Sequence, residues 1–178
     1  MASTLDEIDL DAFERAIDMI IQARNIYVMG LRASAPIAEF FVHYLKFIFP
    51  HVQLIVSGVS DVFEQLSRIG EGDLLIGISF PRYTSRSIEA MEFAHRQGAS
   101  LIAITDGPLS PLHSTADVCL MAKSDMSSFV ESFAAPLSLI NALIVALGQR
   151  RRSEVSEYFH KMEKIWAEYD VYLAKPNE

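Results

Sequence analysis

Apolar residues along this chain form short continuous runs that alternate with stretches of helical periodicity. Five runs have the length and apolar content of strands, at residues 26–29, 51–56, 74–78, 100–104 and 118–121. Between them, apolar residues recur every three or four positions, as on one face of a helix. Because strands and helices alternate, the pattern predicts a parallel sheet that is covered on both faces. We expect an α/β fold, a three-layer α/β/α sandwich with a five-stranded parallel sheet.

Start and stop signals place the helices between these strands. Asp61 and Glu64 have the spacing of a capping box, Ser128 and Glu131 repeat it, and Gly98 is suited to a C-cap. A first helix is predicted before residue 24, because apolar residues recur at helical spacing from residue 10. The other predicted helices cover residues 34–49, 61–68 and 83–97, a long stretch that starts at 128, and residues 153–172.

Two of the predicted helices are apolar on nearly every side. One contains Phe40, Tyr44 and Phe47, and the other contains Leu137 and Val145. A helix that is apolar all round must be buried all round, but the sheet covers only one side of it. The other side needs either the terminal helices of this chain or a second chain. We expect a homodimer or a higher homo-oligomer.

Composition narrows the class of protein. The chain has 178 residues, of which 51% are hydrophobic, and 15 Lys and Arg face 23 Asp and Glu, a formal net charge of −8. This length suits one domain with a sizeable core. The acidic balance argues against nucleic-acid binding by this chain, since phosphate contacts need clustered basic residues. The N-terminal residues are acidic and the apolar stretch 134–147 is shorter than a membrane span, so we expect no membrane and a cytoplasmic location.

Metal and cofactor chemistry has little support in the sequence. Cys119 is the single cysteine, which excludes an intrachain disulfide and a cysteine-rich zinc site. No His, Cys, Asp and Glu residues show the spacing of metal ligands. We expect no metal and no cofactor, a small buried apolar role for Cys119 and a solvated role for the loop acid Asp106.

Hydroxyl groups and two arginines are concentrated directly after the predicted strands. Ligands of an open parallel sheet bind beyond the C-terminal ends of its strands. Helix N-termini, serine and threonine hydroxyls and arginine side chains all suit a phosphate group. We therefore predict a pocket for a phosphorylated polyol or sugar, with the candidate ligand-binding residues Gly30, Arg32, Ser34, Ser79, Arg82, Thr84, Ser85, Ser127 and Ser128.

These polar residues also have structural explanations. Ser34, Thr84 and Ser128 stand where N-cap residues are common, and a cap contributes about 1 kcal/mol to helix stability. Arg32 and Arg82 can pair with acidic side chains instead of a ligand. It is the clustering of such residues over several strand ends that favours a binding site.

The order of these motifs resembles the sugar isomerase (SIS) domain. Residues 30–34 read Gly-x-x-x-Ser at a helix start, residues 78–84 read Ile-Ser followed by Thr84, and residues 104–106 read Ile-Thr-Asp. With Phe80-Pro81-Arg82-Tyr83-Thr84, the chain more closely resembles the SIS half of RpiR-type transcription regulators, over about residues 8–150. The resemblance implies a flavodoxin-like sandwich, dimerisation and phosphosugar binding at these loops. It also divides the chain into a linker and helix (1–24), the SIS domain (25–150) and a C-terminal amphipathic helix (151–178).

The chain departs from the family pattern in two loops. Ser79 and Thr84 match the first serine and the threonine of the family's Ser-x-Ser-Gly-x-Thr loop, but Pro81 and Arg82 replace its middle serine and glycine. Arg32 stands at a common first-loop glycine. Either the arginines bind the anion or they fill the pocket, which would leave a structural dimerisation module.

We expect a phosphosugar-sensing and dimerisation domain of an RpiR-type regulator. Such regulators carry a helix-turn-helix domain that is absent from this chain, so we expect DNA contact only through that domain. The alternative is a phosphosugar isomerase or a stand-alone sugar-phosphate-binding protein. Glu131 is the nearest candidate for a catalytic base, although a capping role beside Ser128 is favoured, and no other catalytic residue is assigned. A dinucleotide site is disfavoured because residues 30–35 lack the second glycine of its fingerprint.

Overall fold

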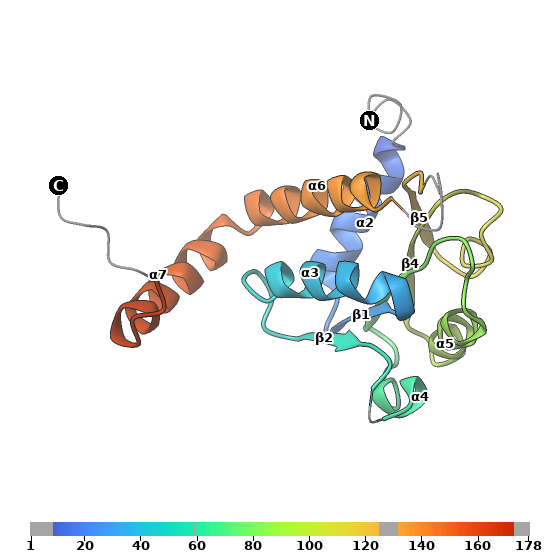
Figure 1. Ribbon diagram of the computed structural model, residues 1–178, viewed down its shortest axis with the longest axis horizontal. Coiled ribbons are helices and arrows are strands. Elements are labelled where there is room, and N and C mark those ends of the chain that lie inside the picture. The colour runs from blue at the N-terminus through green and yellow to red at the C-terminus, as the bar shows by residue number, and fades with distance from the viewer. Residues whose placement is uncertain (1–8, 59, 125–131, 173–178) are drawn as a thin grey trace.

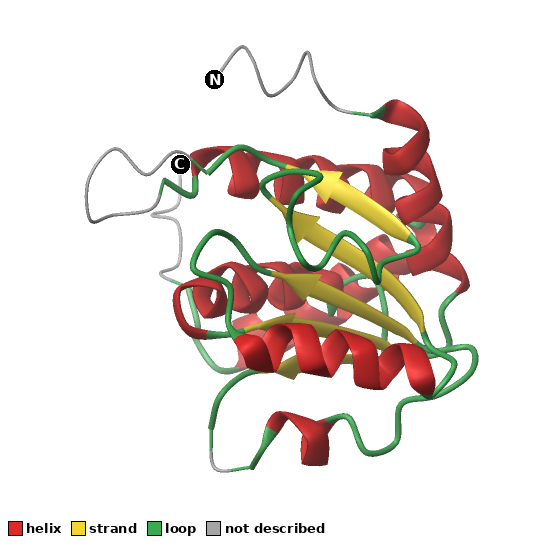
Figure 2. Cartoon of the chain, turned by 90° about the vertical axis from the view of Figure 1, so that its right-hand side faces the viewer, coloured by secondary structure: helices red, strands yellow, loops and turns green. Residues whose placement is uncertain are grey.

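The computed structural model describes residues 9–58, 60–124 and 132–172. Its strands form one all-parallel sheet in the order β2-β1-β3-β4-β5, which confirms the predicted five-stranded parallel sheet (Figures 1 and 2). The strands are β1 (Ile26–Gly30), β2 (Val52–Ile55), β3 (Leu74–Ile78), β4 (Ser100–Thr105) and β5 (Val118–Met121).

Helices cover both faces of the sheet, so the three-layer sandwich is also confirmed. Successive strand residues point to opposite faces. Val28 therefore packs in the apolar core on one face, while its neighbour Met29 packs in the core on the other. The first face is covered by α2 (Leu10–Gln22), α3 (Ala35–Leu45) and α6 (Ala134–Arg150), and the second by α4 (Val62–Gln65) and α5 (Ser85–Arg96).

The start of α6 differs from the prediction. The helix begins at Ala134, and the described residues Ser132 and Phe133 before it are not helical, so the predicted start at Ser128 is wrong. The reason is Pro136, which has no N–H and is tolerated only in the first turn, where the N–H groups have no partner within the helix. The predicted capping box of Ser128 and Glu131 lies outside the described residues.

Two other helices are shorter than predicted. The predicted helix over 34–49 divides into a 3₁₀ turn, η1 (Arg32–Ser34), α3 and a turn over residues 46–49. The last helix, α7 (Arg152–Glu168), ends before residue 172. The capping box of Asp61 and Glu64 is confirmed, and Gly98 follows α5 with a left-handed φ of 82°.

α7 projects away from the sandwich (Figure 1), and none of its residues is buried. It meets the rest of the chain through aromatic rings: Tyr158 stacks on Phe47, just beyond α3, at 5.4 Å between centroids. Among the described helices, none has the length and apolarity needed to cross a membrane.

The outer sides of α3 and α6 carry apolar residues at the surface. Phe41 and Leu143 are buried against the sheet, whereas Tyr44 is 36% exposed and Val145 is 59% exposed. The single chain therefore covers one side of each helix and leaves part of the other side open. The predicted homo-oligomer would cover these residues.

Candidate functional site

The site lies where two neighbouring strands send the chain in opposite directions. β1 pairs with β3, and beyond their C-terminal ends the chain enters α3 on one face of the sheet and α5 on the other. The strand that follows β1 lies on its far side, and the strand that follows β3 lies on the opposite side. Such a point of divergence leaves a crevice between the two loops, which is the usual ligand position in this type of sheet.

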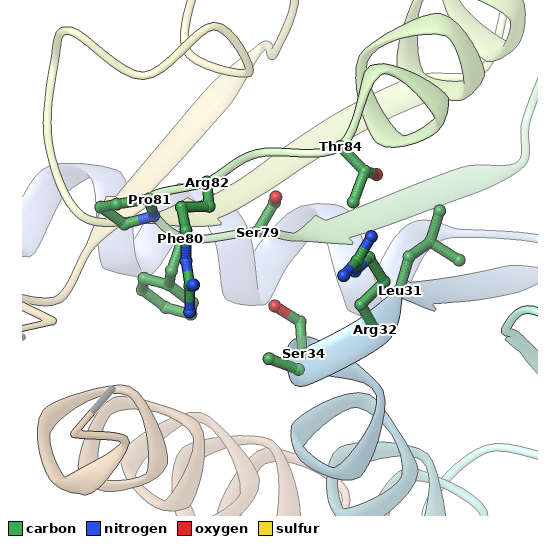
Figure 3. Close-up of a pocket in the computed structure, with 9 residues that line it drawn as sticks. Leu31, Arg32, Ser34, Ser79, Phe80, Pro81, Arg82 and Thr84 are labelled. Carbon is green, nitrogen blue, oxygen red and sulfur yellow. The ribbon is translucent and has the colours of Figure 1, made fainter. Parts of the chain in front are cut away.

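A cavity of about 380 Å³ occupies this crevice (Figure 3). Five of the nine predicted binding residues line it, from both loops, and none of the described residues that line it is acidic. The lining consists of Leu31, Arg32, Ala33, Ser34, Ser79, Phe80, Pro81, Arg82 and Thr84.

Two serine side chains are open to the cavity and largely buried otherwise. Ser34 is 6% exposed and Ser79 is 5% exposed. Ser34 stands at the N-cap position of α3 but makes no capping hydrogen bond, because its own backbone is already helical (φ −81°, ψ −10°). The backbone N–H of Ser79 donates to the carbonyl oxygen of Ile104. Within the described residues, neither hydroxyl group has a hydrogen-bond partner, so both are available to a ligand.

Thr84 serves as a cap. Its Oγ1 accepts a 3.1 Å hydrogen bond from the backbone N–H of Ser87 and lies 2.8 Å from the Ser87 hydroxyl oxygen. The structural explanation of Thr84 is therefore correct, although its side chain also lines the cavity.

Of the other four predicted site residues, the two that the structure describes, Ser85 and Gly30, do not line the cavity. Ser85 is exposed on the first turn of α5. Gly30 is buried at the end of β1, where a Cβ atom would lie 2.5 Å from the carbonyl oxygen of Ser34, so glycine lets the start of α3 approach the strand. Ser127 and Ser128 lie outside the described residues, as does Glu131.

The two arginines of the cavity adopt a backbone conformation that favours glycine. Arg32 has φ 54° and Arg82 has φ 66°. The left-handed conformation costs a non-glycine residue roughly 1–2 kcal/mol. Both residues stand where the resembled family has glycine. In Figure 3 their guanidinium groups lie on opposite sides of the cavity, with the hydroxyl groups of Ser34 and Ser79 between them.

A hydrogen-bond network supports the loop after β3 from outside the cavity. The Tyr83 hydroxyl donates to Oδ1 of Asp106, and the Thr105 hydroxyl donates to Asp106 (3.1 Å) and to Ser110 (2.8 Å). Burial raises the pKa of the Tyr83 hydroxyl, and its hydrogen bond to Asp106 raises it further. The predicted solvated role for Asp106 is wrong, because its carboxylate anchors Tyr83.

Cys119 packs against the apolar core on the α4 and α5 face, as predicted, but it is only partly buried there. Burial, and secondarily the charge of Asp106, raises the pKa of its thiol to about 11, which makes it a poor nucleophile or metal ligand. In the part of the chain that the structure describes, no three His, Cys, Asp or Glu side chains are placed to hold a metal ion.

Sequence reasoning missed the left-handed arginines and the anchor at Asp106. The first had a signal, because an arginine at a family glycine inherits that position's backbone. The second had none, because Tyr83 and Asp106 are 23 residues apart and meet only when β3 pairs with β4.

A family model and the sequence relatives of this chain point to the same family. The SIS domain model matches residues 19–146. HexR of Pseudomonas aeruginosa, an HTH-type transcriptional regulator, is 29% identical over 164 residues, or 88% of this chain and 56% of HexR. An uncharacterized HTH-type transcriptional regulator of Caldanaerobacter subterraneus is 26% identical over 170 residues, or 92% of this chain and 59% of that protein. The chain thus spans somewhat more than half the length of these relatives.

Solved structures agree with this fold. The sugar isomerase domain of an RpiR transcription factor from Sphaerobacter thermophilus superposes with a TM-score of 0.87 at 25% identity, over 92% of each chain. The Vibrio vulnificus NanR protein, complexed with ManNAc-6P, superposes with a TM-score of 0.79 at 20% identity, over 98% of this chain and 66% of NanR. The NanR similarity is a similarity of fold.

Proposed function

This chain belongs to the SIS domain family, and we propose that it is the phosphosugar-sensing and dimerisation domain of an RpiR-type transcriptional regulator. Its SIS domain is homologous to that of the HexR and RpiR regulators. The proposed ligand is a sugar phosphate, and the proposed role implies a cytoplasmic location.

The cavity between β1 and β3 carries this proposal. It combines two available serine hydroxyls with two arginines, and the lining residues within 9–58, 60–124 and 132–172 include no acidic side chain, in a protein whose formal net charge is −8. Serine hydroxyls and arginine are suited to phosphate oxygens, and hydroxyls also suit the hydroxyl groups of a sugar. The cavity volume of about 380 Å³ lies within the range of small-molecule sites.

Dimerisation is supported by the outer surface of the α3 and α6 helices and by α7. Val145 and Tyr44 are exposed on the first surface, and Phe159 and Ile165 are 37% and 36% exposed on α7. A second copy of the chain would remove these side chains from water.

DNA binding is assigned in this proposal to a helix-turn-helix domain outside these 178 residues. The curated relatives are named HTH-type regulators and are longer than this chain. The acidic balance of the SIS domain itself does not suit DNA.

The proposal is tested by titrating the chain with a panel of pentose and hexose phosphates. A sugar phosphate that binds will raise the melting temperature, because ligand binding stabilises the native state. Ser79→Ala should weaken that binding about tenfold, as expected from a lost hydrogen bond to a charged group. Ser67→Ala, on an exposed residue after α4, is the matched control and should bind normally.

Two results would contradict the proposal. In the first, no member of the panel changes the melting temperature of the wild-type chain. In the second, a bound sugar phosphate is converted into its isomer, which would identify an enzyme instead of a sensor.

A further inference from the structure

The projecting helix α7 carries an aromatic groove of about 690 Å³. Three aromatic rings and two carboxylates surround it. The lining consists of Phe159, Glu163, Trp166, Ala167, Asp170 and Tyr172. Because α7 points away from the sandwich and none of its residues is buried, the described part of this chain leaves the groove open to solvent (Figure 1).

The rings of the groove are steeply inclined to one another. Phe159 and Trp166 are two helical turns apart, with centroids separated by 6.1 Å and planes at 68°. Beyond the helix, a left-handed turn at Asp170 (φ 49°) is closed by a hydrogen bond from the Val171 N–H to the Trp166 carbonyl oxygen. This turn brings the ring of Tyr172 to 5.2 Å from that of Trp166, at 87°. Aromatic rings arranged in this way around one space suit a cation, because each ring face carries negative partial charge.

The groove also has unpaired negative charge. Glu163 and Asp170 line it, and within the described ranges neither carboxylate forms an ion pair. Among the described residues that line the groove, none is basic. A lysine or arginine side chain fits such a groove, because its apolar stem packs on the rings while its charged end meets the carboxylates.

The outer surface of α3 offers a cation of this kind. Four rings on that surface are in mutual contact, at centroid distances of 4.9–5.8 Å: Phe40, His43, Tyr44 and Phe47. Lys46 is the C-cap residue of α3, is exposed, and directly precedes Phe47. In the part of the chain that the structure describes, Lys46 has no ion-pair partner. The acidic residue of α3, Glu39, lies about 10 Å earlier along the helix.

Two copies of the chain related by a two-fold axis can bring these surfaces together. In one copy, α7 begins beside the end of α3, where Phe47 stacks on Tyr158 and contacts Phe159 at 5.3 Å. The 17 residues of α7 then extend about 25 Å. If the α7 helices of two copies run antiparallel, the far end of each helix reaches the near end of the other, and with it the end of the other copy's α3. Such a contact is isologous, so both grooves are filled at once.

We propose that α7 docks on the α3 surface of a second copy of this chain, and that Lys46 of that copy enters the aromatic groove between Glu163 and Asp170. This inference rests on the dimerisation in the proposed function and names the residues that make the contact. The second copy is the occupant that the charges favour, since the acidic aromatic groove and the basic aromatic surface are complementary and belong to the same chain.

Charge reversal tests the pair. Lys46→Glu and Glu163→Lys should each raise the dissociation constant of the dimer about tenfold, measured by sedimentation equilibrium. The variant that carries both changes restores opposite charges and should dimerise within about threefold of the wild type. Arg68→Glu, after α4, and Glu157→Lys, on an exposed α7 residue outside the groove, are the matched controls and should leave the dissociation constant unchanged.

Trp166 reports on the groove directly, because it is the single tryptophan of the chain and lines the groove. Its fluorescence emission should move to longer wavelength when the wild-type protein is diluted through its dissociation constant, since the indole ring then meets water. Lys46→Glu should show the long-wavelength emission at concentrations where the wild type is a dimer, although the substitution is on another helix. Far-ultraviolet circular dichroism confirms that both variants remain folded.

The results separate this inference from the proposed function. If the single charge reversals leave the dimer intact, or if the combined variant stays as weak as the single ones, Lys46 and Glu163 do not meet and the inference is wrong. It is also wrong if Trp166 keeps its emission while the dimer dissociates, because the groove then lies outside the interface. A wild-type monomer overturns both the inference and the proposed dimerisation. If the charge pair is restored as expected but no sugar phosphate binds, the inference stands and the proposed sensing role fails.

Discussion

The hydroxyl group of Tyr83 donates a 2.5 Å hydrogen bond to Oδ1 of Asp106, which ties the loop after β3 to the end of β4. Tyr83 lies between two residues that line the cavity, Arg82 and Thr84. Asp106 is in turn bonded by the hydroxyl of Thr105, which also contacts Ser110. The position of the cavity loop thus depends on a network outside the cavity.

Tyr83→Phe should therefore weaken ligand binding without a ligand contact being removed. We expect the free energy of unfolding to fall by about 1 kcal/mol, the net value of one such hydrogen bond. The affinity for the sugar phosphate should also fall, because the cavity loop would no longer be held to Asp106 by the Tyr83 hydrogen bond. Calorimetry and urea denaturation measure the two effects. Tyr169→Phe, on an exposed tyrosine after α7, is the control, and equal affinities for the two variants would contradict the prediction.

Gly30→Ala should destabilise the domain. A Cβ atom at Gly30 would lie 2.5 Å from the Ser34 carbonyl oxygen and 2.6 Å from the Ala38 Cβ atom, so the start of α3 would have to move away from β1. Overpacking of this kind costs roughly 1–3 kcal/mol. Gly148→Ala is the matched control, since a Cβ atom there meets nothing within 4 Å and α6 should gain up to about 1 kcal/mol. Denaturant midpoints that shift in the same direction would show that the close approach at Gly30 is not required.

Arg32→Gly should stabilise the free protein while it weakens ligand binding. Glycine relieves the left-handed strain at φ 54°, worth roughly 1–2 kcal/mol, but it also increases the entropy of the unfolded chain by about half that amount. The net gain in unfolding free energy should be about 0.5–1 kcal/mol. Arg96→Gly, near the end of α5, carries the same chemical change on a helical backbone and should lose about 1 kcal/mol. A loss of stability in Arg32→Gly would contradict this account of the loop.

Asp73 should make stability depend on acid pH. It is 1% exposed, and burial alone would raise the pKa of its carboxyl. Hydrogen bonds from Arg24, Asn25 and the Gly70 N–H outweigh burial and hold that pKa below its ordinary value. The stabilisation is therefore complete above the unfolded-state pKa of about 4 and is lost as pH falls through the lower folded-state value.

Asp73→Asn tests this pH dependence. The variant should be less stable at pH 7 by roughly 1–3 kcal/mol, because the donors that now bond the Asp73 carboxylate would lose a charged acceptor. Its stability should also fall less steeply than that of the wild type below pH 4. Glu154, whose pKa of about 2 reflects hydrogen bonds from Ser153 and Arg151, titrates in both proteins and cancels in the difference. Parallel curves of unfolding free energy between pH 7 and pH 3 would contradict the prediction.

Val145→Asp should shift the protein toward a monomer. Val145 is 59% exposed on α6 in the single chain, and a charge at that position would be costly to bury in an apolar interface. Light scattering should give about twice 19.9 kDa or more for the wild type and a lower mass for the variant. Ser67→Asp adds the same charge after α4, on the opposite face of the sheet, and should leave the mass unchanged. A wild-type mass near 19.9 kDa at micromolar concentration would reject the dimer.

The fold was predictable because its signals are local. Runs such as Leu74–Ile78 are apolar at every position, as strands buried on both faces must be, and all five predicted strands are present. Helix ends were less predictable where two local signals compete. At the start of α6 the hydroxyl and carboxylate of Ser128 and Glu131 favoured an early start, whereas Pro136 permits a helix only from its own first turn.

The candidate site was predictable in position and only partly in composition. Parallel strands bring their C-terminal ends together, so the sequence alone pointed to Ser34, Ser79 and the two arginines. It could not distinguish the capping hydroxyl of Thr84 from the available hydroxyl of Ser34, because both occupy N-cap positions. The difference lies in the backbone conformation of the N-cap residue. Thr84 is extended before α5, whereas Ser34 is helical before α3.

By itself, the sequence determined the order of strands and helices, the α/β class and the set of hydroxyl and arginine residues that follow the strands. These follow from periodicity and from the chemistry of single side chains. Only the tertiary structure decided that Arg32 and Arg82 lie on opposite sides of one cavity and that Tyr83 reaches Asp106. Such relationships depend on which strands pair and on the direction in which each loop leaves the sheet, and these arise from packing of the whole chain.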